Sequence, residues 1–482
     1  MRRSAAAVVG VLIALACACV ASAADIGAND DTGKYAFDGG AFFTEMADLG
    51  LRQTVLTARF VPGERALNEQ QEALDRAVPL AVAAGLRVSL AVYPYPPRQI
   101  ERRLTAPRDF AAYVSLLARR YPDVKRFVIL NEPNQPAFMR PQFAPTGKIV
   151  SAATAGRFLA VAYDALKLVD RRIEVIGLGL SPRGNDDPDA PTNVSTSPVR
   201  FLAALGAWYR ASGRRAPLMD GLSFHPYPNR ATDPLERGYA WPNAGFTNLS
   251  RVKQALWDAF HGTKQRTTLG GLELSLDEVG WQVDTSSRIG YTGVENVPVT
   301  SEAKQASIYG ELVRGAHCDD DVAEVNIFGF YDDTARNTGF QSALNRADGS
   351  PRPSAAAVSR AISDGPSCAV LPPWRPTRRV VGAQRPTVSV QASAIVVQVT
   401  ADEGAAVVAC AIQGALTSAR AQRVLRVRTA SSPECVGRRT MPQRLTTLRL
   451  PRPPAGMTAT VAVRLAAEAN PARTSVFTQL AR

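Results

Sequence analysis

Residues 127–136 of this 482-residue chain read FVILNEPNQP, and this stretch decides the fold. Four apolar residues lead directly into Asn131-Glu132-Pro133. A short apolar run bounded by turn-forming residues predicts a buried parallel strand. Pro133 has no amide hydrogen to donate to a sheet, so we expect the strand to end near it. Glu132 would then lie at the carboxyl end of a strand, where barrels and open parallel sheets place their functional side chains.

Strand-like and helix-like segments alternate along the first three quarters of the chain. Eight runs are predicted as strands: residues 25–28, 51–57, 86–93, 127–131, 173–180, 218–225, 271–279 and 324–331. Eight segments are predicted as helices: residues 40–49, 68–84, 109–120, 154–170, 198–212, 249–261, 301–317 and 353–363. Eight β–α units in one order predict an α/β fold, a parallel sheet closed into a (β/α)8 TIM barrel. Residues 185–197 and 229–246 are predicted as long loops on the face where such a barrel builds its site.

A small all-β domain is predicted after the barrel, which would cover residues 24–370. Residues 371–385 begin with LPPWRP and have the composition of a stiff linker rich in Pro and Arg. Seven short β-rich runs follow within residues 386–482: residues 387–390, 394–400, 406–412, 423–428, 444–450, 458–465 and 475–480. Their spacing and alternation predict an antiparallel β-sandwich, which we interpret as an accessory domain.

The first residues have the features of an export signal. A basic start, MRR, precedes an apolar run of small residues, and Ala21-Ser22-Ala23 fits a signal-peptidase site. We therefore predict that residues 1–23 are a signal peptide and that the protein is secreted or held in the cell envelope. The alternative is a membrane anchor, but the run is short for a membrane span. No membrane contact is expected after removal of the signal.

Four cysteines lie outside this segment: Cys318, Cys368, Cys410 and Cys435. An even number in an exported protein predicts disulfides, for which three connectivities are possible. Pairing within each domain favours Cys318–Cys368 in the barrel and Cys410–Cys435 in the sandwich. The cysteines lack the close spacing of a zinc site and the chain has only 3 histidines, so no metal and no cofactor is predicted.

The net charge is concentrated in the second domain. The whole chain has a formal charge of +13, and residues 371–482 alone carry sixteen arginines against four acidic residues, or +12. Such a surface either attracts a polyanion, such as an acidic cell-wall polymer, or simply keeps the domain soluble. A nucleic-acid partner is not expected, because the chain is predicted to be exported and has no recognisable nucleic-acid-binding motif.

A second motif, LDEVGW at residues 276–281, ends the seventh predicted strand. Glu132 and Glu278 therefore end the fourth and seventh strands, which open onto the same mouth of a barrel. Cleavage of a glycosidic bond needs two such carboxyl groups facing each other across the sugar. One gives a proton to the leaving oxygen, while the other must be ionised to attack or stabilise the anomeric carbon.

The order and placing of Asn131-Glu132-Pro133 and Glu278-Val279-Gly280-Trp281 resemble the clan of retaining (β/α)8 glycoside hydrolases called the 4/7 superfamily. The motifs look most like those of its families 39 and 5, and the resemblance covers residues 25–363. It implies that Glu132 is the acid/base and Glu278 the nucleophile. It also implies that Asn131 binds the 2-hydroxyl of the sugar, a contact that strengthens in the transition state. The implied substrate is a β-linked oligo- or polysaccharide.

Further residues take roles from the same resemblance. His225 and Tyr227, which end the sixth strand, would bind the sugar or orient the nucleophile; otherwise they form a packed strand end. Hydrogen bonds from these two side chains are expected to keep Glu278 ionised. Trp281 either stacks on a sugar face or packs beneath Glu278. Arg59 stands a few residues later than the strand-two arginine that supports the nucleophile in many relatives.

The seventh strand departs from the expected pattern. Strict alternation would place Glu273, Ser275 and Asp277 on one face and Glu278 on the other, with the leucines. A β-bulge near the end of the strand would bring Glu278 to the site.

The main interpretation is thus a secreted retaining glycoside hydrolase. A non-catalytic carbohydrate-binding or cell-surface barrel is the alternative from another class, and a transglycosylase is an alternative on the same scaffold. The sequence does not specify the sugar, the linkage, or endo against exo action.

Overall fold

The structure is a computed structural model that describes residues 23–36, 38–63, 66, 70–95, 106–369, 372–452, 454 and 457–481. All of the predicted signal peptide except Ala23 lies outside the described residues. Within the described part of the chain, none of the helices has the length and apolar character needed to cross a membrane.

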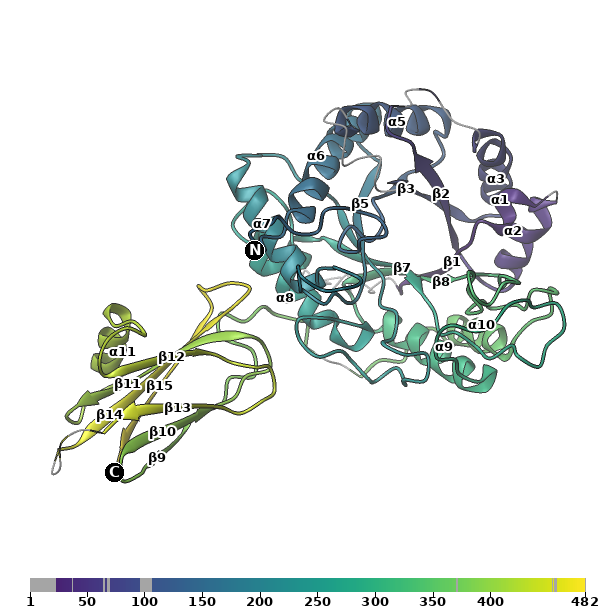
Figure 1. The fold of residues 1–482 in the computed structure, drawn as a ribbon. Helices are drawn as coiled ribbons and strands as arrows, with labels where there is room; N and C mark the ends of the chain where they lie inside the picture. The colour runs from purple at the N-terminus through teal and green to yellow at the C-terminus, as the bar shows by residue number, and fades with distance from the viewer. Residues whose placement is uncertain are drawn as a thin grey trace, which may run out of the picture.

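Eight parallel strands close into a barrel, as predicted (Figure 1). They are β1 (Asp25–Asn29), β2 (Gln53–Phe60), β3 (Arg87–Pro94), β4 (Arg126–Ile129), β5 (Glu174–Leu180), β6 (Gly221–Phe224), β7 (Glu273–Val279) and β8 (Val322–Phe328). Strand β1 pairs with both β2 and β8, and this pairing closes the sheet. The carboxyl ends of all eight strands therefore lie at one mouth of the barrel.

Helices surround this barrel (Figure 1). The eight that were predicted are α2 (Gly39–Asp48), α3 (Gln71–Ala83), α5 (Ala106–Arg120), α6 (Ser151–Val169), α7 (Pro198–Ala211), α8 (Leu249–Phe260), α9 (Glu302–His317) and α10 (Pro353–Asp364). Three short helical segments were not predicted: α1 (Thr32–Tyr35), η1 (Phe246–Asn248) and η2 (Thr268–Gly270). The side chain of Ser301 caps α9 by accepting a hydrogen bond from the amide of Lys304, which explains where this helix begins.

The barrel interior is filled below its mouth. Near the amino ends of the strands, the fully buried carboxylate of Glu324 is 3.1 Å from Arg126 and 3.3 Å from Arg87, and it accepts a hydrogen bond from Ser275. A buried carboxylate needs such partners to offset its loss of hydration. An apolar layer of Val55, Ala91, Val128 and Ile176 lies above it. Within the described part of the barrel interior, the open space is therefore at the carboxyl-terminal mouth.

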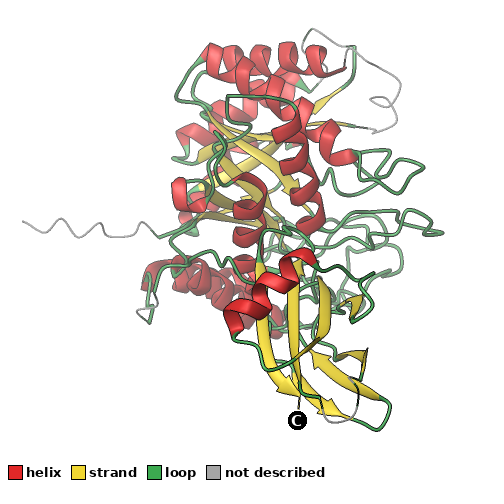
Figure 2. Ribbon diagram, turned by 90° about the vertical axis from the view of Figure 1, so that its left-hand side faces the viewer, coloured by secondary structure: helices red, strands yellow, loops and turns green. Residues whose placement is uncertain are grey.

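The second domain is a β-sandwich of seven strands, as predicted (Figure 2). One sheet has the order β13-β10-β9 and the other β12-β11-β14-β15. The strands are β9 (Thr387–Val390), β10 (Ala394–Val399), β11 (Ala405–Gln413), β12 (Cys435–Arg439), β13 (Thr446–Pro451), β14 (Ala459–Ala467) and β15 (Thr474–Ala481). All pairs within these two sheets are antiparallel.

One predicted strand of the sandwich is wrong. Residues 423–428 belong mostly to helix α11 (Ser418–Val427), and the strand that was missed is β12. The apolar residues of this segment suit a helix as well, because Ala421 and Leu425 are buried one helical turn apart. Thr417 caps the helix by accepting a hydrogen bond from the amide of Arg420.

Both predicted disulfides are confirmed. Cys318 and Cys368, with Cα atoms 5.4 Å apart, join the end of α9 to the segment after α10. Cys410 and Cys435 are opposite each other on β11 and β12. Each bridge therefore lies within one domain.

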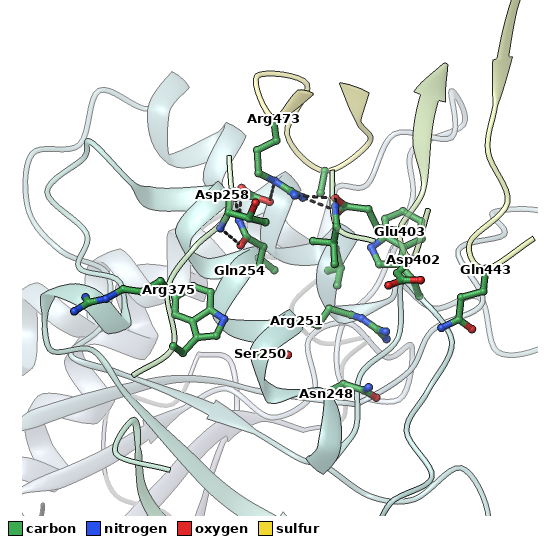
Figure 3. Close-up of a pocket in the computed structure, with 17 residues that line it drawn as sticks. Asn248, Ser250, Arg251, Gln254, Asp258, Arg375, Asp402, Glu403, Gln443 and Arg473 are labelled. Carbon is green, nitrogen blue, oxygen red and sulfur yellow. Dashed lines mark hydrogen bonds and ion pairs between the residues drawn. The ribbon is translucent and has the colours of Figure 1, made fainter. Parts of the chain in front are cut away.

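A buried ion cluster joins the sandwich to the barrel. Arg473, which precedes β15 and is only 2% exposed, lies 2.9 Å from Asp258 on α8. The same guanidinium makes hydrogen bonds of 2.7 and 2.6 Å to the carboxylate of Glu403, between β10 and β11. One cation thus neutralises one carboxylate from each domain, and Figure 3 shows it between them.

The segment predicted as a linker contacts both domains. The backbone of Thr377 exchanges two hydrogen bonds with the side chain of Gln254 on α8. Three residues later, Val380 is buried in the apolar core of the sandwich. The sandwich is therefore held against α8 by several contacts as well as by chain connectivity.

Replacing Arg473 tests the strength of this junction. Arg473→Met would leave Asp258 and Glu403 buried without their cation, so we expect the free energy of unfolding to fall by roughly 3–5 kcal/mol. Urea denaturation followed by circular dichroism and by tryptophan fluorescence would measure it. Arg428→Met is the matched control, because its guanidinium is 46% exposed beside Glu434 and should contribute less than about 1 kcal/mol. Equal effects of the two substitutions would contradict the prediction.

Candidate active site

The backbone around Glu132 adopts an uncommon conformation. Strand β4 ends at Ile129, and the φ angles of Leu130 and Glu132 are 74° and 36°. Side-chain-bearing residues rarely adopt positive φ, and each such residue costs on the order of 1–3 kcal/mol. The amide of Glu132 donates to the carbonyl of Gly179, 2.9 Å away at the end of β5, and this bond holds the turn. Strain of this kind is concentrated at functional sites.

The two asparagines of the motif have different surroundings. Asn134 is fully buried and its side chain bonds the backbone of Ser181 and Thr196, which ties the loop after β4 to the loop after β5. Asn131 is only partly buried, and its side chain makes no hydrogen bond with any described residue. Asn134 therefore supports the loop, while the amide of Asn131 is available to a ligand.

Glu278 reaches the site through the expected β-bulge. The pairing of β7 with β8 shifts register between Leu276 and Val279, so that Asp277 and Glu278 together face a single residue, Asn326. The bulge allows both carboxyl groups to point toward the barrel axis, where strict alternation would have sent one of them outward.

His225 lies between the two glutamates. Its fully buried ring places Nδ1 3.3 Å from Glu132 Oε1 and 3.4 Å from Glu278 Oε2. Its other nitrogen, Nε2, is 3.2 Å from Asp277 Oδ1, which is an ion-pair contact without hydrogen-bond geometry. Each glutamate side chain is 17% exposed, so both carboxyl groups remain accessible from the mouth.

The shared contact limits the distance between the glutamates. Because Oε1 of Glu132 and Oε2 of Glu278 both touch one nitrogen, their separation cannot exceed the sum of the two distances, about 6.7 Å. Inverting glycosidases separate their carboxyl groups by roughly 6.5–9.5 Å to admit a water molecule, whereas retaining enzymes hold them about 5–5.5 Å apart. The upper limit here falls at the lower edge of the inverting range.

Burial and charge together set the protonation of this group. Burial alone would lower the pKa of His225, but the charges of Glu278 and Asp277 outweigh it and raise this pKa well above 6.5. Burial raises the pKa of Glu278 to about 7, and the charges of Asp277 and Glu132 act in the same direction. His225 and Tyr227 lower the pKa of Glu278 as expected, but burial outweighs them. The expectation that these neighbours would keep Glu278 ionised is therefore corrected.

Further side chains hold this arrangement in place. The hydroxyl of Tyr227 donates a hydrogen bond to Glu278 Oε2 at 3.2 Å, and this bond was predicted from the sequence. The amide of Asn29, at the end of β1, donates to the carbonyl of Asp277 at 3.1 Å and lies 3.5 Å from Glu278 Oε1. The hydroxyl of Ser223 donates to Asp277. Side chains from β1, β6 and β7 thus hold the two glutamates in place together with the turn after β4.

Trp281 and Arg59 occupy other positions. Trp281 is 2% exposed and its indole nitrogen donates to the carbonyl of Asp233, so of the two alternatives the structure has the packed one. Arg59, exposed near the end of β2, places its guanidinium 5.7 Å from the ring centre of Tyr95. Trp281 therefore supports the strand end, and the role of Arg59 in substrate binding stays a prediction.

Several participating residues were not identified from the sequence. Asn29 and Ser223 carry no local signal, because their role depends on strands that are distant in the chain. For Asp277 the sequence predicted only a position on one face of the seventh strand. It did not predict that the negative charge of this residue faces His225. Phe328 packs edge-on to Tyr227 and to the half-exposed Phe340, which gives the mouth an aromatic wall.

The chemistry of the site follows from this geometry. Two partly exposed carboxyl groups face one mouth, and an imidazolium between them compensates their charge. Such a pair can transfer a proton and supply a carboxylate nucleophile. Among the described residues, no group of three or more His, Cys, Asp or Glu side chains is arranged to hold a metal ion.

No protein-family model matches this chain, and no curated protein does either. Solved structures similar to it include a family 39 glycoside hydrolase from Bacteroides cellulosilyticus WH2, with 16% identity, a TM-score of 0.47, and 89% of this chain and 81% of that chain covered. A GH5_18 protein from Bifidobacterium longum subsp. longum ATCC 55813 has 15% identity and a TM-score of 0.48, covering 77% and 84%. Xylanase 10B from Thermotoga maritima has 12% identity and a TM-score of 0.43, covering 70% and 94%.

The charges around Glu278 can be tested without an activity assay. Carboxyl 13C NMR should give Glu278 a pKa near 7 in the native protein. His225→Gln should raise this pKa further, because the opposing imidazolium is lost. Tyr227→Phe should raise it less, since it removes one hydrogen bond and keeps the ring. A native pKa near the ordinary 4.5, or a lower pKa in His225→Gln, would contradict the assignment.

Proposed function

We propose that this protein is a glycoside hydrolase that cleaves a β-linked oligo- or polysaccharide with retention at the anomeric carbon. The observation that carries the proposal is the contact of a single atom, His225 Nδ1, with a carboxylate oxygen of both Glu132 and Glu278. It keeps these two oxygens within about 6.7 Å of each other, which leaves out nearly all of the inverting range of roughly 6.5–9.5 Å and so favours retention.

The two glutamates take different roles in the first step. Glu132 gives its proton to the glycosidic oxygen as the bond to the leaving group breaks. Glu278 attacks the anomeric carbon in its ionised form, which with a pKa of about 7 is present around neutral pH, and forms a covalent glycosyl-enzyme. The hydroxyl of Tyr227 and the amide of Asn29 hold the attacking carboxylate, and Asn131 would bind the sugar.

The second step uses the change in charge that the first produces. Formation of the ester removes the negative charge of Glu278. Glu132, now ionised, takes a proton from water, and the resulting hydroxide equivalent attacks the anomeric carbon from the face that the leaving group left. Glu278 is released as a carboxylate, and the configuration at the anomeric carbon is retained. An acceptor sugar in place of water would make the same enzyme a transglycosylase.

The proposal also includes export and a polyanionic partner. A signal peptide at residues 1–23 would direct the protein to the cell envelope or the medium. Helix α11 presents Arg420, Arg423 and Arg426 on its exposed side, and these residues suit an acidic cell-wall polymer. Such binding should weaken steeply with salt, because exposed charges are screened over about 8–10 Å at ordinary ionic strength.

Two substitutions separate the catalytic roles. Glu278→Ala should abolish turnover of aryl glycosides, and azide should restore part of it with product of inverted configuration. Glu132→Ala should slow substrates with poor leaving groups by about 10²–10⁴-fold, and activated aryl glycosides far less, because only the former need the proton. Initial rates and NMR of the first product would measure both effects.

Glu236→Ala is the matched control, since Glu236 is exposed on the loop between β6 and α8. It should retain native rates. Native-like activity in Glu278→Ala, or an inverted first product from the unmodified enzyme, would overturn the assignment. Binding of glycans without turnover would favour a non-catalytic carbohydrate-binding barrel.

A further inference from the structure

A pocket of about 300 Å3 lies between the barrel and the sandwich (Figure 3). Its walls come from the start of α8, from the segment around Trp374 and from three loops of the sandwich. The buried cluster of Arg473, Asp258 and Glu403 closes one side. None of these lining residues belongs to the site of Glu132 and Glu278, so the pocket is a separate feature that exists only where the two domains meet.

The pocket extends along α8, and one part of it lies at the same end of the barrel as the glutamates. Asn248 and Arg251 stand at the start of α8, and in a (β/α)8 barrel the helices begin on the side of the strand carboxyl ends. Hydrogen bonds connect the two places through the loop after β6. Arg251 donates to the carbonyl of Tyr239 at 2.9 Å, and the Tyr239 hydroxyl donates to the carbonyl of Tyr227 at 3.0 Å. Tyr227 in turn donates to Glu278.

Several polar side chains of the pocket have hydrogen-bond donors or acceptors that make no hydrogen bond with a described residue. Both hydrogen bonds that Arg251 makes with described residues come from Nη1, which leaves the donors of Nε and Nη2. The carboxylate of Asp402 and the amide of Gln443 make no side-chain hydrogen bond with a described residue. Figure 3 shows the guanidinium of Arg251 among Asn248, Asp402 and Gln443, which line the same pocket.

These groups and the indoles favour a polyhydroxylated, uncharged ligand. Three arginines (Arg251, Arg375 and Arg473) and three acidic residues (Asp258, Asp402 and Glu403) line the pocket. Their formal charges balance, so neither a strongly acidic nor a strongly basic ligand would be preferred. Trp374 is half-buried in the wall and offers a ring to the C–H face of a sugar. Trp241 gives a second indole, although Arg200 covers one of its faces at 5.4 Å. Apolar rings with a few convergent donors and acceptors are the usual composition of a small-ligand site.

We propose that this pocket binds a sugar unit of the glycan substrate away from the bond that is cleaved, an inference that rests on the function proposed above. Arg251, Asp402 and Gln443 would bind the hydroxyl groups, and Trp374 would stack on the ring. The sandwich would then contribute to substrate binding by completing a site that the barrel alone only half forms.

Hydrogen–deuterium exchange on the full chain tests this proposal. Glu278→Gln would be used so that the probes are not consumed, with oligosaccharides of β-glucan, xylan and mannan as probes. A glycan that binds should protect residues 248–255 and 401–404 as well as residues 276–281. Asp402→Asn and Trp374→Ala would each be added to Glu278→Gln. Each should raise about tenfold the glycan concentration needed to protect residues 248–255 and 401–404, while residues 276–281 stay protected.

Glu434→Gln is the matched control, because it also removes a carboxylate from the sandwich but outside the pocket. This substitution should not change the protection of any of the three segments by the glycan. Melting temperatures of all variants would show whether the domain junction is intact.

The outcomes distinguish this proposal from the proposed activity. Protection of residues 276–281 alone, with turnover by the native enzyme, would overturn the proposal that the pocket binds sugar and leave the proposed hydrolase activity intact. Protection of the pocket segments alone, without turnover of any probe, would support sugar binding in the pocket and overturn the proposed hydrolase activity. Absence of protection with every probe, or protection that Asp402→Asn and Trp374→Ala do not alter, would overturn the pocket.

Discussion

The site depends on one electrostatic constraint: Glu132, Asp277 and Glu278 are held together in a place with little access to water. Carboxylates in such surroundings lose their hydration and repel one another, and an opposite charge must compensate them. His225 is placed to do this, because one ring nitrogen faces two of the carboxyl groups and the other faces the third. The raised pKa values of His225 and Glu278 are two results of the same crowding.

That crowding requires a backbone that regular strands could not supply. A bulge in β7 brings Asp277 and Glu278 to the same side, and a turn with positive φ at Leu130 and Glu132 ends β4. Gly179 permits the close approach of the ring, since a side chain there would meet His225 Nε2 at 2.9 Å. The buried layers beneath, which fill the barrel interior, give these irregular strand ends a rigid base.

The order of the elements could be predicted from the sequence, because most of the barrel strands are short apolar runs and the helices have amphipathic spacing. Glu132 and Glu278 could be proposed from the sequence because each lies close to the carboxyl end of a recognisable strand. Contacts between distant segments were not predictable: the role of Asn29 depends on strand closure, and the packing of Trp281 depends on the carbonyl of Asp233. The prediction of a strand at residues 423–428 was wrong because the spacing of their apolar residues suits strand and helix alike. The raised pKa of Glu278 could not be predicted, because it depends on how deeply the carboxyl group is buried and no local sequence pattern contains that information.

The junction between the domains has consequences for function that a flexible linker would not have. A tethered module would increase the local concentration of substrate but would sample many positions. Here the buried guanidinium of Arg473 pairs with Asp258 and Glu403, and Gly404 leaves room for Trp241, with which a side chain at that position would collide at 2.5 Å. The position of the sandwich relative to α8 is therefore fixed. A glycan bound at the junction would be held at a defined distance and angle from Glu278, so that binding energy gained there can orient the bond to be cleaved.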